Sequence, residues 1–222
     1  MTVLEILAHP GTTGPLVLTA KVLAVSGVMH LAAGLILGYW LNGPRSLLRE
    51  VVDFLVTLPL VFPPIATGFV LLMVLGRNGP LGRWLGLDVI FSFQGLVLAA
   101  FVSGLPLVVK PVQAALRGSA RQLAETAYVL GKGPLETYVR VLLPTIRRNV
   151  AAGMFLALGR SLGEVGITLM LGGDIIGKTN TLSLEIYNAV FSGEFDRAMV
   201  LSAIIGIISL GLFLVLRRLS AV

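Results

Sequence analysis

The chain has 222 residues, of which 56% are hydrophobic and only 13% are charged, and its mean hydropathy is +0.93. Soluble domains carry about 25% charged residues, so this composition excludes an ordinary soluble domain and indicates a protein that lies in a lipid bilayer. The sequence has no cysteine, which excludes disulfide bonds and thiolate chemistry. His9 and His30 stand apart from each other and from any acidic cluster, so no metal site is expected.

Five apolar segments are long enough to cross a membrane, because a bilayer core of about 30 Å needs roughly 20 apolar residues in a helix. We therefore predict an all-α integral membrane protein with about five transmembrane helices. A short outer segment, residues 1–15, precedes the first span, and a cytoplasmic tail, residues 217–222, follows the last. The start of the chain lacks the basic region of a cleaved signal peptide, so the first span is expected to be retained. The expected spans cover about residues 16–41, 54–75, 89–109, 150–171 and 198–216.

The basic residues outside the spans predict the orientation of the chain. Eleven of them lie on the side of the long loop between the third and fourth spans, and four lie on the opposite side. By the positive-inside rule the N-terminus is outside and the C-terminus is cytoplasmic. The net charge of +6 is thus explained by topology, and nucleic acid is not an expected partner. The inner residues are Arg45, Arg49, Lys110, Arg117, Arg121, Lys132, Arg140, Arg147, Arg148, Arg217 and Arg218, and the outer ones are Arg77, Arg83, Lys178 and Arg197.

The second expected span contains Pro59, Pro63 and Pro64. Each proline removes a backbone donor, so the helix should bend or break there. Broken backbone at membrane depth is tolerated only where protein or water satisfies it. Pro63, Pro64 and the nearby Thr67 are therefore candidates for lining a translocation path or gate, although a kinked packing helix explains the prolines equally well. A turn-rich outer loop follows at 76–84.

The longest polar stretch, Lys110 to Asn149, falls on the cytoplasmic side. Apolar residues recur at helical spacing from 121 to 130, Gly131 is a typical helix stop, and a second helix is expected from Pro134 until Pro144. An exposed apolar stripe on such a loop suggests a protein partner. A hairpin that packs on its own chain is the alternative.

The residue spacing in this loop resembles the EAA loop of ABC importer permeases. That pattern is Glu-Ala-Ala, three residues, Gly, nine residues and Ile-x-Leu-Pro, and every spacing is kept here, with Thr126 in place of Ala and Val141 in place of Ile. The resemblance implies the type I ABC importer transmembrane domain over residues 16–216, with a cytoplasmic loop at 117–144 whose coupling helix docks into a groove of the ATPase subunit. The matching residues are Glu125, Thr126, Ala127, Gly131, Val141, Leu143 and Pro144.

Within that family the chain looks most like the permeases of molybdate importers, with tungstate and sulfate permeases close behind. The residues that carry this likeness lie at 58–64, 159–166 and 172–187. The resemblance implies a subunit of a prokaryotic cytoplasmic membrane that translocates an oxyanion by alternating access. The implied partners are a second copy of the chain, two ATPase subunits and an extracytoplasmic oxyanion-binding protein. The chain itself would bind no cofactor and catalyse no reaction, since ATP and Mg are used by the ATPase.

Two charges, Arg160 and Glu164, fall inside the fourth expected span at a spacing of four, so they share a helix face and can pair. A charge at a helix centre costs about 2.5–3.5 kcal/mol on insertion scales, so the pair should face the bundle or a wet cavity. Arg160 and its neighbour Ser161 are candidates for an anion path or gate, and an ion pair that merely orients the helix is the alternative. The pair would also permit an ion-coupled secondary transporter, but no internal repeat supports one. A membrane enzyme would need a cluster of His or Asp residues near one face, and the sequence has none.

The segment from Gly172 to Thr179 matches the P-loop pattern G-x-x-x-x-G-K-[ST]. A P-loop follows a strand and opens a helix, whose N-terminus holds the phosphates. This segment follows a bilayer-length span and lies on the outer side. We therefore interpret it as a glycine turn that leads to an outer helix, from Ser183 to Ser192, which helps to receive a binding protein.

Overall fold

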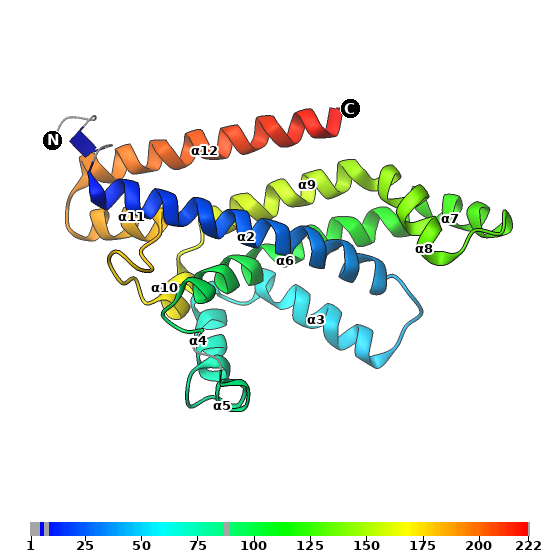
Figure 1. The fold of residues 1–222 in the computed structure, drawn as a ribbon, viewed down its shortest axis with the longest axis horizontal. Coiled ribbons are helices and arrows are strands. Elements are labelled where there is room, and N and C mark those ends of the chain that lie inside the picture. The colour runs from blue at the N-terminus through cyan, green and yellow to red at the C-terminus, as the bar shows by residue number, and fades with distance from the viewer. Residues whose placement is uncertain (1–4, 7–8, 87–88, 222) are drawn as a thin grey trace.

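The computed structural model describes residues 5–6, 9–86 and 89–221, and these are helical over most of their length, with no strand among them (Figure 1). Five of the described helical segments are long and apolar enough to cross a membrane, judged by length and composition. The predicted all-α membrane class is confirmed.

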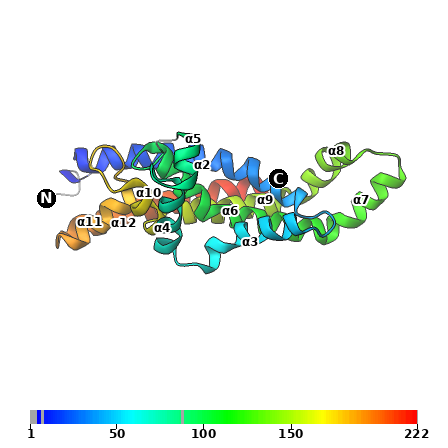
Figure 2. The same ribbon diagram turned by 90° about the horizontal axis from the view of Figure 1, so that it is seen from below.

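Four long helices run lengthwise beside one another, and they are α2 (Pro10–Trp40), α6 (Phe93–Arg117), α9 (Leu143–Leu162) and α12 (Phe195–Ala221). Helices α7 (Ser119–Val129) and α8 (Pro134–Thr137) project beyond one end, here called the α7 end, while α11 (Leu182–Phe191) lies at the other, the α11 end (Figures 1 and 2). Helix α2 starts at the α11 end, and α12 runs from there toward the α7 end.

Helices α2 and α6 approach each other closely because two glycines four residues apart share one face of α2. A Cβ atom at Gly34 would lie 2.3 Å from Cγ1 of Val108, and one at Gly38 would lie 2.4 Å from Cγ1 of Val112. Small residues at this spacing let the backbone of one membrane helix pack directly against the side chains of another.

A hydrophobic core joins α6, α7, the turn after α8, and α9. Its buried members are Val108, Val112, Leu116, Ala120, Tyr138, Leu142, Ile146 and Ala157.

The second expected span, 54–75, consists of two helices, α3 (Leu47–Val61) and α4 (Pro64–Leu75). The break falls where the prolines predict it, since Phe62 is extended and Pro63 has no N–H to donate. The carbonyl of Pro63 is satisfied by the N–H of Thr67, at 2.9 Å. Helix α4 projects sideways from the long helices and carries the short α5 (Pro80–Leu85), which lies in the expected outer loop, at its far end (Figures 1 and 2).

The fourth expected span, 150–171, is also two helices, because α9 ends at Leu162 and α10 (Gly166–Gly172) starts anew. Helix α9 in turn begins well before residue 150, so the span that the structure offers is shifted toward the α7 end.

The ends of the chain differ from expectation in a similar way. Helix α2 begins at Pro10, inside the segment 1–15 that was expected to precede the first span; residues 1–4 and 7–8 of that segment lie outside the described residues. Helix α12 continues to Ala221, so most of the expected tail at 217–222 is helical, and residue 222 is not described.

The third expected span, 89–109, corresponds to helix α6, which starts at Phe93 and continues past residue 109 to Arg117.

Candidate functional site

The EAA-like residues form a compact turn between α7 and α8 at the α7 end. Gly131 adopts a φ of +78°, in the left-handed region that glycine enters without steric cost. The N–H of Lys132 then donates to the carbonyl of Ala127 at 3.0 Å, which closes the end of α7. Gly133 leads into α8, where Pro134 occupies the first helical position. The glycine of the motif therefore lies at the position where the turn needs a positive φ.

The tip of this loop carries large apolar side chains that the chain leaves uncovered. Val129 is 88% exposed, Leu130 74% and Leu135 75%, whereas Ala127 of the motif is buried. These three residues lie at the far end of the projection, beyond the long helices. Apolar side chains grouped on a projecting tip are the mark of a surface that a partner covers.

Two polar side chains of the motif, those of Glu125 and Thr126, make local contacts on α7. The carboxylate of Glu125 pairs with Nε of Arg121 at 3.0 Å, and the hydroxyl of Thr126 donates to the carbonyl of Gln122 at 2.9 Å. Both members of the Glu125 pair are exposed, and such surface pairs contribute about 0–1 kcal/mol. Glu125 is therefore free to exchange its partner at little cost.

The chain enters α9 through a π-helical turn, η1 (Tyr138–Leu142), in which the N–H of Leu143 donates to the carbonyl of Tyr138. Pro144 has no N–H, so the regular α-helical bond to Arg140 cannot form, and a wider turn relieves the mismatch. The helix that was expected to end at Pro144 instead passes through it into α9. The proline of the motif thus marks a change of helical register, not a stop.

Two residues that sequence reasoning missed attach this turn to the rest of the molecule. The hydroxyl of Tyr138 donates to the carbonyl of Leu35 at 2.8 Å, and its ring lies 4.2 Å from that of Tyr39 on α2. Leu142 is buried in the core, while the motif residues on either side of it are only half-buried. The signal was present, because Tyr138, Leu142 and Ile146 repeat at a spacing of four.

The Arg160–Glu164 pair forms, but it bridges a helix break and does not lie along one helix. Nη1 of Arg160 is 2.5 Å from Oε2 of Glu164, while Oε1 of Glu164 accepts a 2.7 Å hydrogen bond from the N–H of Ile167. The Glu164 side chain is 1% exposed and that of Arg160 is 35% exposed. The carboxylate therefore both holds the end of α9 and starts α10.

The predicted path residues on α4 lie beside this break, although about a hundred residues separate them in the chain. A Cβ atom at Gly166 would be 3.0 Å from Cβ of Pro64, and one at Gly68 would be 2.9 Å from Cα of Ile167. Helices α4 and α10 therefore pack so closely that neither glycine leaves room for a side chain. Thr67 is buried and donates to the carbonyl of Pro63 at 3.2 Å. The structure thus brings Pro63, Pro64 and Thr67 to the region of Glu164.

Ser161 does not face an open path in this conformation. It is buried, and its hydroxyl donates to the carbonyl of Ala100 on α6 at 2.9 Å. Ser161 therefore fastens α9 to α6 one residue after the arginine of the ion pair. The residues of the EAA-like loop lie apart from this region, at the α7 end.

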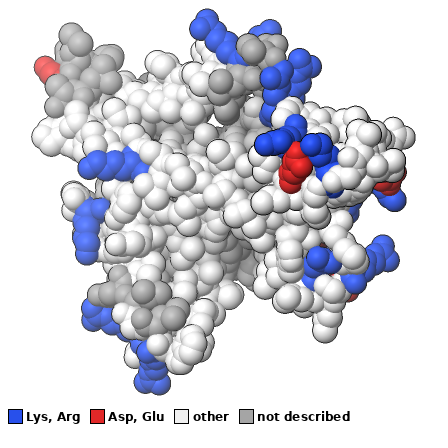
Figure 3. All heavy atoms as spheres, turned by 45° about the vertical axis from the view of Figure 1, so that its right-hand side comes forward, with Lys and Arg blue, Asp and Glu red and all other residues white. Residues whose placement is uncertain are grey.

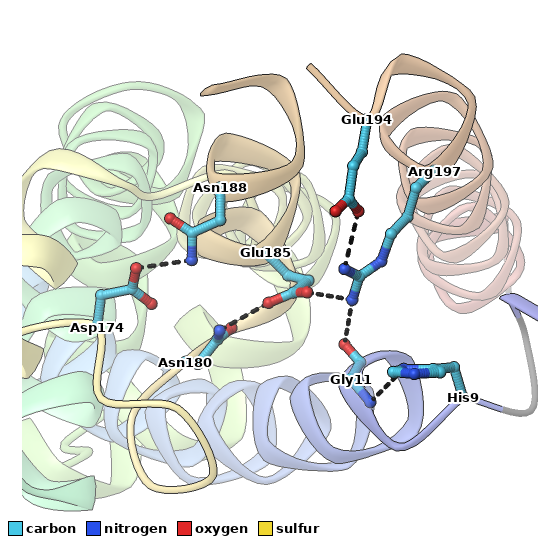
Figure 4. Close-up of polar contacts among 8 residues, drawn as sticks. All are labelled: His9, Gly11, Asp174, Asn180, Glu185, Asn188, Glu194 and Arg197. Carbon is cyan, nitrogen blue, oxygen red and sulfur yellow. Dashed lines mark hydrogen bonds and ion pairs between the residues drawn. The ribbon is translucent and has the colours of Figure 1, made fainter. Parts of the chain in front are cut away.

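At the α11 end, an ion-pair network ties three helices together (Figure 4). Arg197 of α12 pairs with Glu185 of α11 and, at 3.2 Å, with Glu194, and it also donates to the carbonyl of Gly11 on α2. The amide of Asn180 donates to Glu185 at 2.7 Å. Sequence reasoning did not single out this network, which joins residues 186 positions apart.

The P-loop-like segment sits next to this network and has none of the geometry of a P-loop. It follows helix α10, and its Thr179 is fully buried, donating to the carbonyl of Gly172 at 2.7 Å and accepting from the N–H of Ile175 at 2.9 Å. A P-loop threonine needs its hydroxyl free for the metal ion. This segment is a turn that leads to α11, which spans nearly the same residues as the expected outer helix.

His30 is packed inside the bundle, where its Nε2 lies 3.0 Å from the carbonyl of Phe101 and its ring stacks on that of Phe101. Among the described residues no group of three or more His, Cys, Asp or Glu side chains could hold a metal ion.

Comparison with known proteins agrees with this geometry. The family described as the binding-protein-dependent transport system inner membrane component matches residues 31–221. The chain belongs to this family. It is thus a multi-pass membrane component of the ABC importer class.

Relatives in this transport family are similar over most of their length. The chain is 36% identical over 185 residues to the molybdenum transport system permease protein ModB of Azotobacter vinelandii, covering 82% of each protein. It is 32% identical over 201 residues to the ModB protein of Escherichia coli strain K12, covering 87% of this chain and 88% of that one.

A solved structure shows the same fold at lower sequence identity. The chain matches one chain in the crystal structure of a bacterial alginate ABC transporter in complex with an alginate pentasaccharide-bound periplasmic protein. The TM-score is 0.77 at 19% identity, over 98% of this chain and 82% of the other.

Proposed function

We propose that the chain is the permease subunit of an ATP-driven importer that moves molybdate across the cytoplasmic membrane by alternating access. Membership of the inner-membrane component family supports an importer subunit, and the similarity to molybdenum transport permeases supports this substrate. Tungstate and sulfate are oxyanions of the same tetrahedral kind, and they remain the alternatives that a test must separate.

The observation that carries the proposal is the uncovered apolar tip of the loop at the α7 end, formed by Val129, Leu130 and Leu135. In a permease this tip would dock on a separate ATPase subunit, one for each of two permease chains. ATP and Mg would then be used by the ATPase alone. The anchor through Tyr138 would carry the movement of the docked loop into α2 and α9.

The proposed orientation places the α7 end in the cytoplasm. Arg117, Arg121, Lys132 and Arg140 all lie on or beside the projecting loop, as the positive-inside rule requires of a cytoplasmic segment. The α11 end would then face outward, where a binding protein delivers the oxyanion.

A second copy of the chain would complete the path. Helix α4 projects sideways from the long helices (Figure 1), and its exposed side chains are apolar, among them Ile65, Phe69 and Met73. A partner copy packed there would enclose the contact between α4 and α10, next to Glu164. In this arrangement Arg160, which is one-third exposed, would be the cation nearest to the passing anion, and Glu164 would moderate its charge.

Competition between anions tests the substrate. Vesicles that contain the chain, its ATPase and its binding protein would be given labelled molybdate with unlabelled molybdate, tungstate or sulfate in excess. Suppression by molybdate, with sulfate ineffective, is the expected result. Suppression by sulfate as strong as that by molybdate would reassign the substrate to sulfate while leaving the importer intact.

A further inference from the structure

A large cavity at the α7 end is not used by the proposed transport cycle. Its volume is about 840 Å³, and it lies between the segment that follows α2, the end of α6, and α7. Its lining includes four arginines, Arg45, Arg49, Arg117 and Arg121, and no aspartate or glutamate among the described residues. Figure 3, which brings this end of the molecule forward, shows basic side chains scattered over the surface and only small acidic areas.

Most of this positive charge has no carboxylate to neutralise it. Arg121 pairs with Glu125 at 3.0 Å, but Arg117 donates from Nε to the amide oxygen of Asn42, at 2.9 Å. Arg49 donates to the carbonyl of Pro44 and lies 5.3 Å from the ring of Trp40. Arg45 makes no ion pair or hydrogen bond within the described chain. Among the described residues, Arg121 is thus the one arginine of the four that makes an ion pair, although the charge of Arg117 also acts on Asp53, the carboxylate that pairs with Lys110.

The cavity also has the features of the membrane–water boundary. Trp40, the last residue of α2, lines it, and tryptophan is enriched where lipid headgroups meet water. Leu47 and Leu48 begin α3 directly after the cavity's own loop, and both are exposed. A molecule in the cavity could therefore place an anionic group among the arginines and an apolar chain along α3.

From this arrangement we propose that the cavity binds the headgroup of an anionic phospholipid of the inner leaflet. Guanidinium groups match phosphate oxygens in planar, paired hydrogen bonds, and basic pockets between helices on the cytoplasmic side suit such headgroups. The volume agrees, because ligand pockets commonly measure about 300–1,000 Å³ and a bare oxyanion would leave most of this one empty. The inference uses the proposed orientation and does not depend on which oxyanion is transported.

The site has a functional consequence, because Arg121 and Tyr128 of α7 line the same cavity as Arg45. A bound headgroup would join the loop after α2 to the helix that docks on the ATPase. Anionic lipid would therefore steady the coupling helix.

Native mass spectrometry of the purified importer tests the site. The assembled transporter would be stripped of lipid and then offered phosphatidylglycerol, phosphatidylcholine, or phosphatidylglycerol with excess inorganic phosphate. The variant Arg45→Gln/Arg117→Gln removes two charges from the cavity. The matched control, Arg217→Gln/Arg218→Gln, removes two exposed charges from the end of α12.

We expect phosphatidylglycerol to bind about tenfold better than phosphatidylcholine, the cavity variant to lose about tenfold in affinity, and the control to stay within roughly twofold. Equal loss in both variants would overturn the proposal, since it would mean general attraction to basic surface. Displacement of the lipid by inorganic phosphate would overturn it too, because the site would then belong to a free anion.

A second measurement does not depend on the variants' folding. Phosphatidylglycerol that carries a photoreactive group near its phosphate should label peptides from 40–49 or 116–128 in the unaltered importer. Labelling confined to other peptides would contradict the site.

Discussion

The hydroxyl of Tyr138 donates a 2.8 Å hydrogen bond to the carbonyl oxygen of Leu35, which lies 103 residues earlier in the chain. This bond joins α2 to the start of the π-helical turn, which follows the exposed loop tip in the chain. Any movement of the loop that keeps the bond must move α2 as well. The contact is thus a direct mechanical link between the projecting loop and α2.

Replacement of Tyr138 by phenylalanine should weaken this link while keeping the ring contact with Tyr39. The lost bond is worth about 0.5–1.5 kcal/mol, so uptake per ATP hydrolysed should fall by a factor of about 2–10. The measurement is the ratio of uptake to ATP hydrolysis in reconstituted vesicles. Tyr187→Phe, at the α11 end, is the control and should leave the ratio unchanged. An unchanged ratio in Tyr138→Phe would show that the bond transmits nothing.

Gly131 and Gly133 offer a matched pair for testing the loop. Gly131 has a φ of +78° and Gly133 a φ of −72°, and a Cβ atom would meet nothing within 4 Å at either position. Alanine at Gly131 should therefore cost about 1–2 kcal/mol through backbone conformation alone. We expect Gly131→Ala to reduce co-purification of the ATPase and Gly133→Ala to keep it. Equal co-purification by the two variants would mean that the turn geometry does not set docking.

The close packing of α2 on α6 predicts a steric effect at Gly34. Its Cβ would lie 2.3 Å from Val108, so Gly34→Ala should destabilise the protein by about 1–3 kcal/mol. Gly14→Ala is the control on the same helix, since nothing lies within 4 Å of it, and it should be neutral or stabilising. The thermal unfolding midpoint in detergent is the readout. Adding Val108→Ala to Gly34→Ala should cost less than the two single changes together; strict additivity would argue against the contact.

Glu164 has two roles that different substitutions separate. Glu164→Gln keeps an oxygen for the N–H of Ile167 but loses the charge, whereas Glu164→Ala loses both. Removing one partner of a buried pair costs about 3–5 kcal/mol, and less here because Arg160 is partly exposed. We expect Glu164→Ala to assemble worst and Glu164→Gln to fall between it and the unaltered chain.

The double change Arg160→Gln/Glu164→Gln decides whether Arg160 also serves transport. If the pair only orients the helices, the neutral pair should restore both assembly and uptake. If Arg160 attracts the anion, assembly should return and uptake should not, which is the result that the proposed path requires. Arg160→Ala with normal assembly and normal uptake would remove Arg160 from the path.

The residues that could be predicted from the sequence are those whose role is local. The prolines at 63 and 64 indicated the break between α3 and α4, and the spacing of four indicated that Arg160 and Glu164 would meet. The direction in which α4 projects was not predictable. It depends on close packing of α4 against α10, at Gly68 and Gly166, and these two helices are about a hundred residues apart in the chain. The end of α9 before Glu164 was not predicted, because two charges at a spacing of four also fit one continuous helix.

Long-range polar contacts were equally hidden. Tyr138 bonds to Leu35, and Arg197 bonds to Gly11. Each bond joins two segments that are distant in the sequence and become neighbours only when the chain folds. The same holds for the arginine-lined cavity. Its charges were visible in the sequence as part of the positive-inside count, but their gathering around one cavity depends on how α2, α6 and α7 meet.

The central claim is that this permease works only when coupled to ATP hydrolysis. Its most direct test is the uptake of labelled molybdate into vesicles that contain the chain, its ATPase and its binding protein, measured with ATP, without ATP, and with ATP in the Gly131→Ala variant. The account predicts uptake that requires ATP and falls in the variant. Uptake of the same size without ATP would contradict it and would favour an ion-coupled transporter.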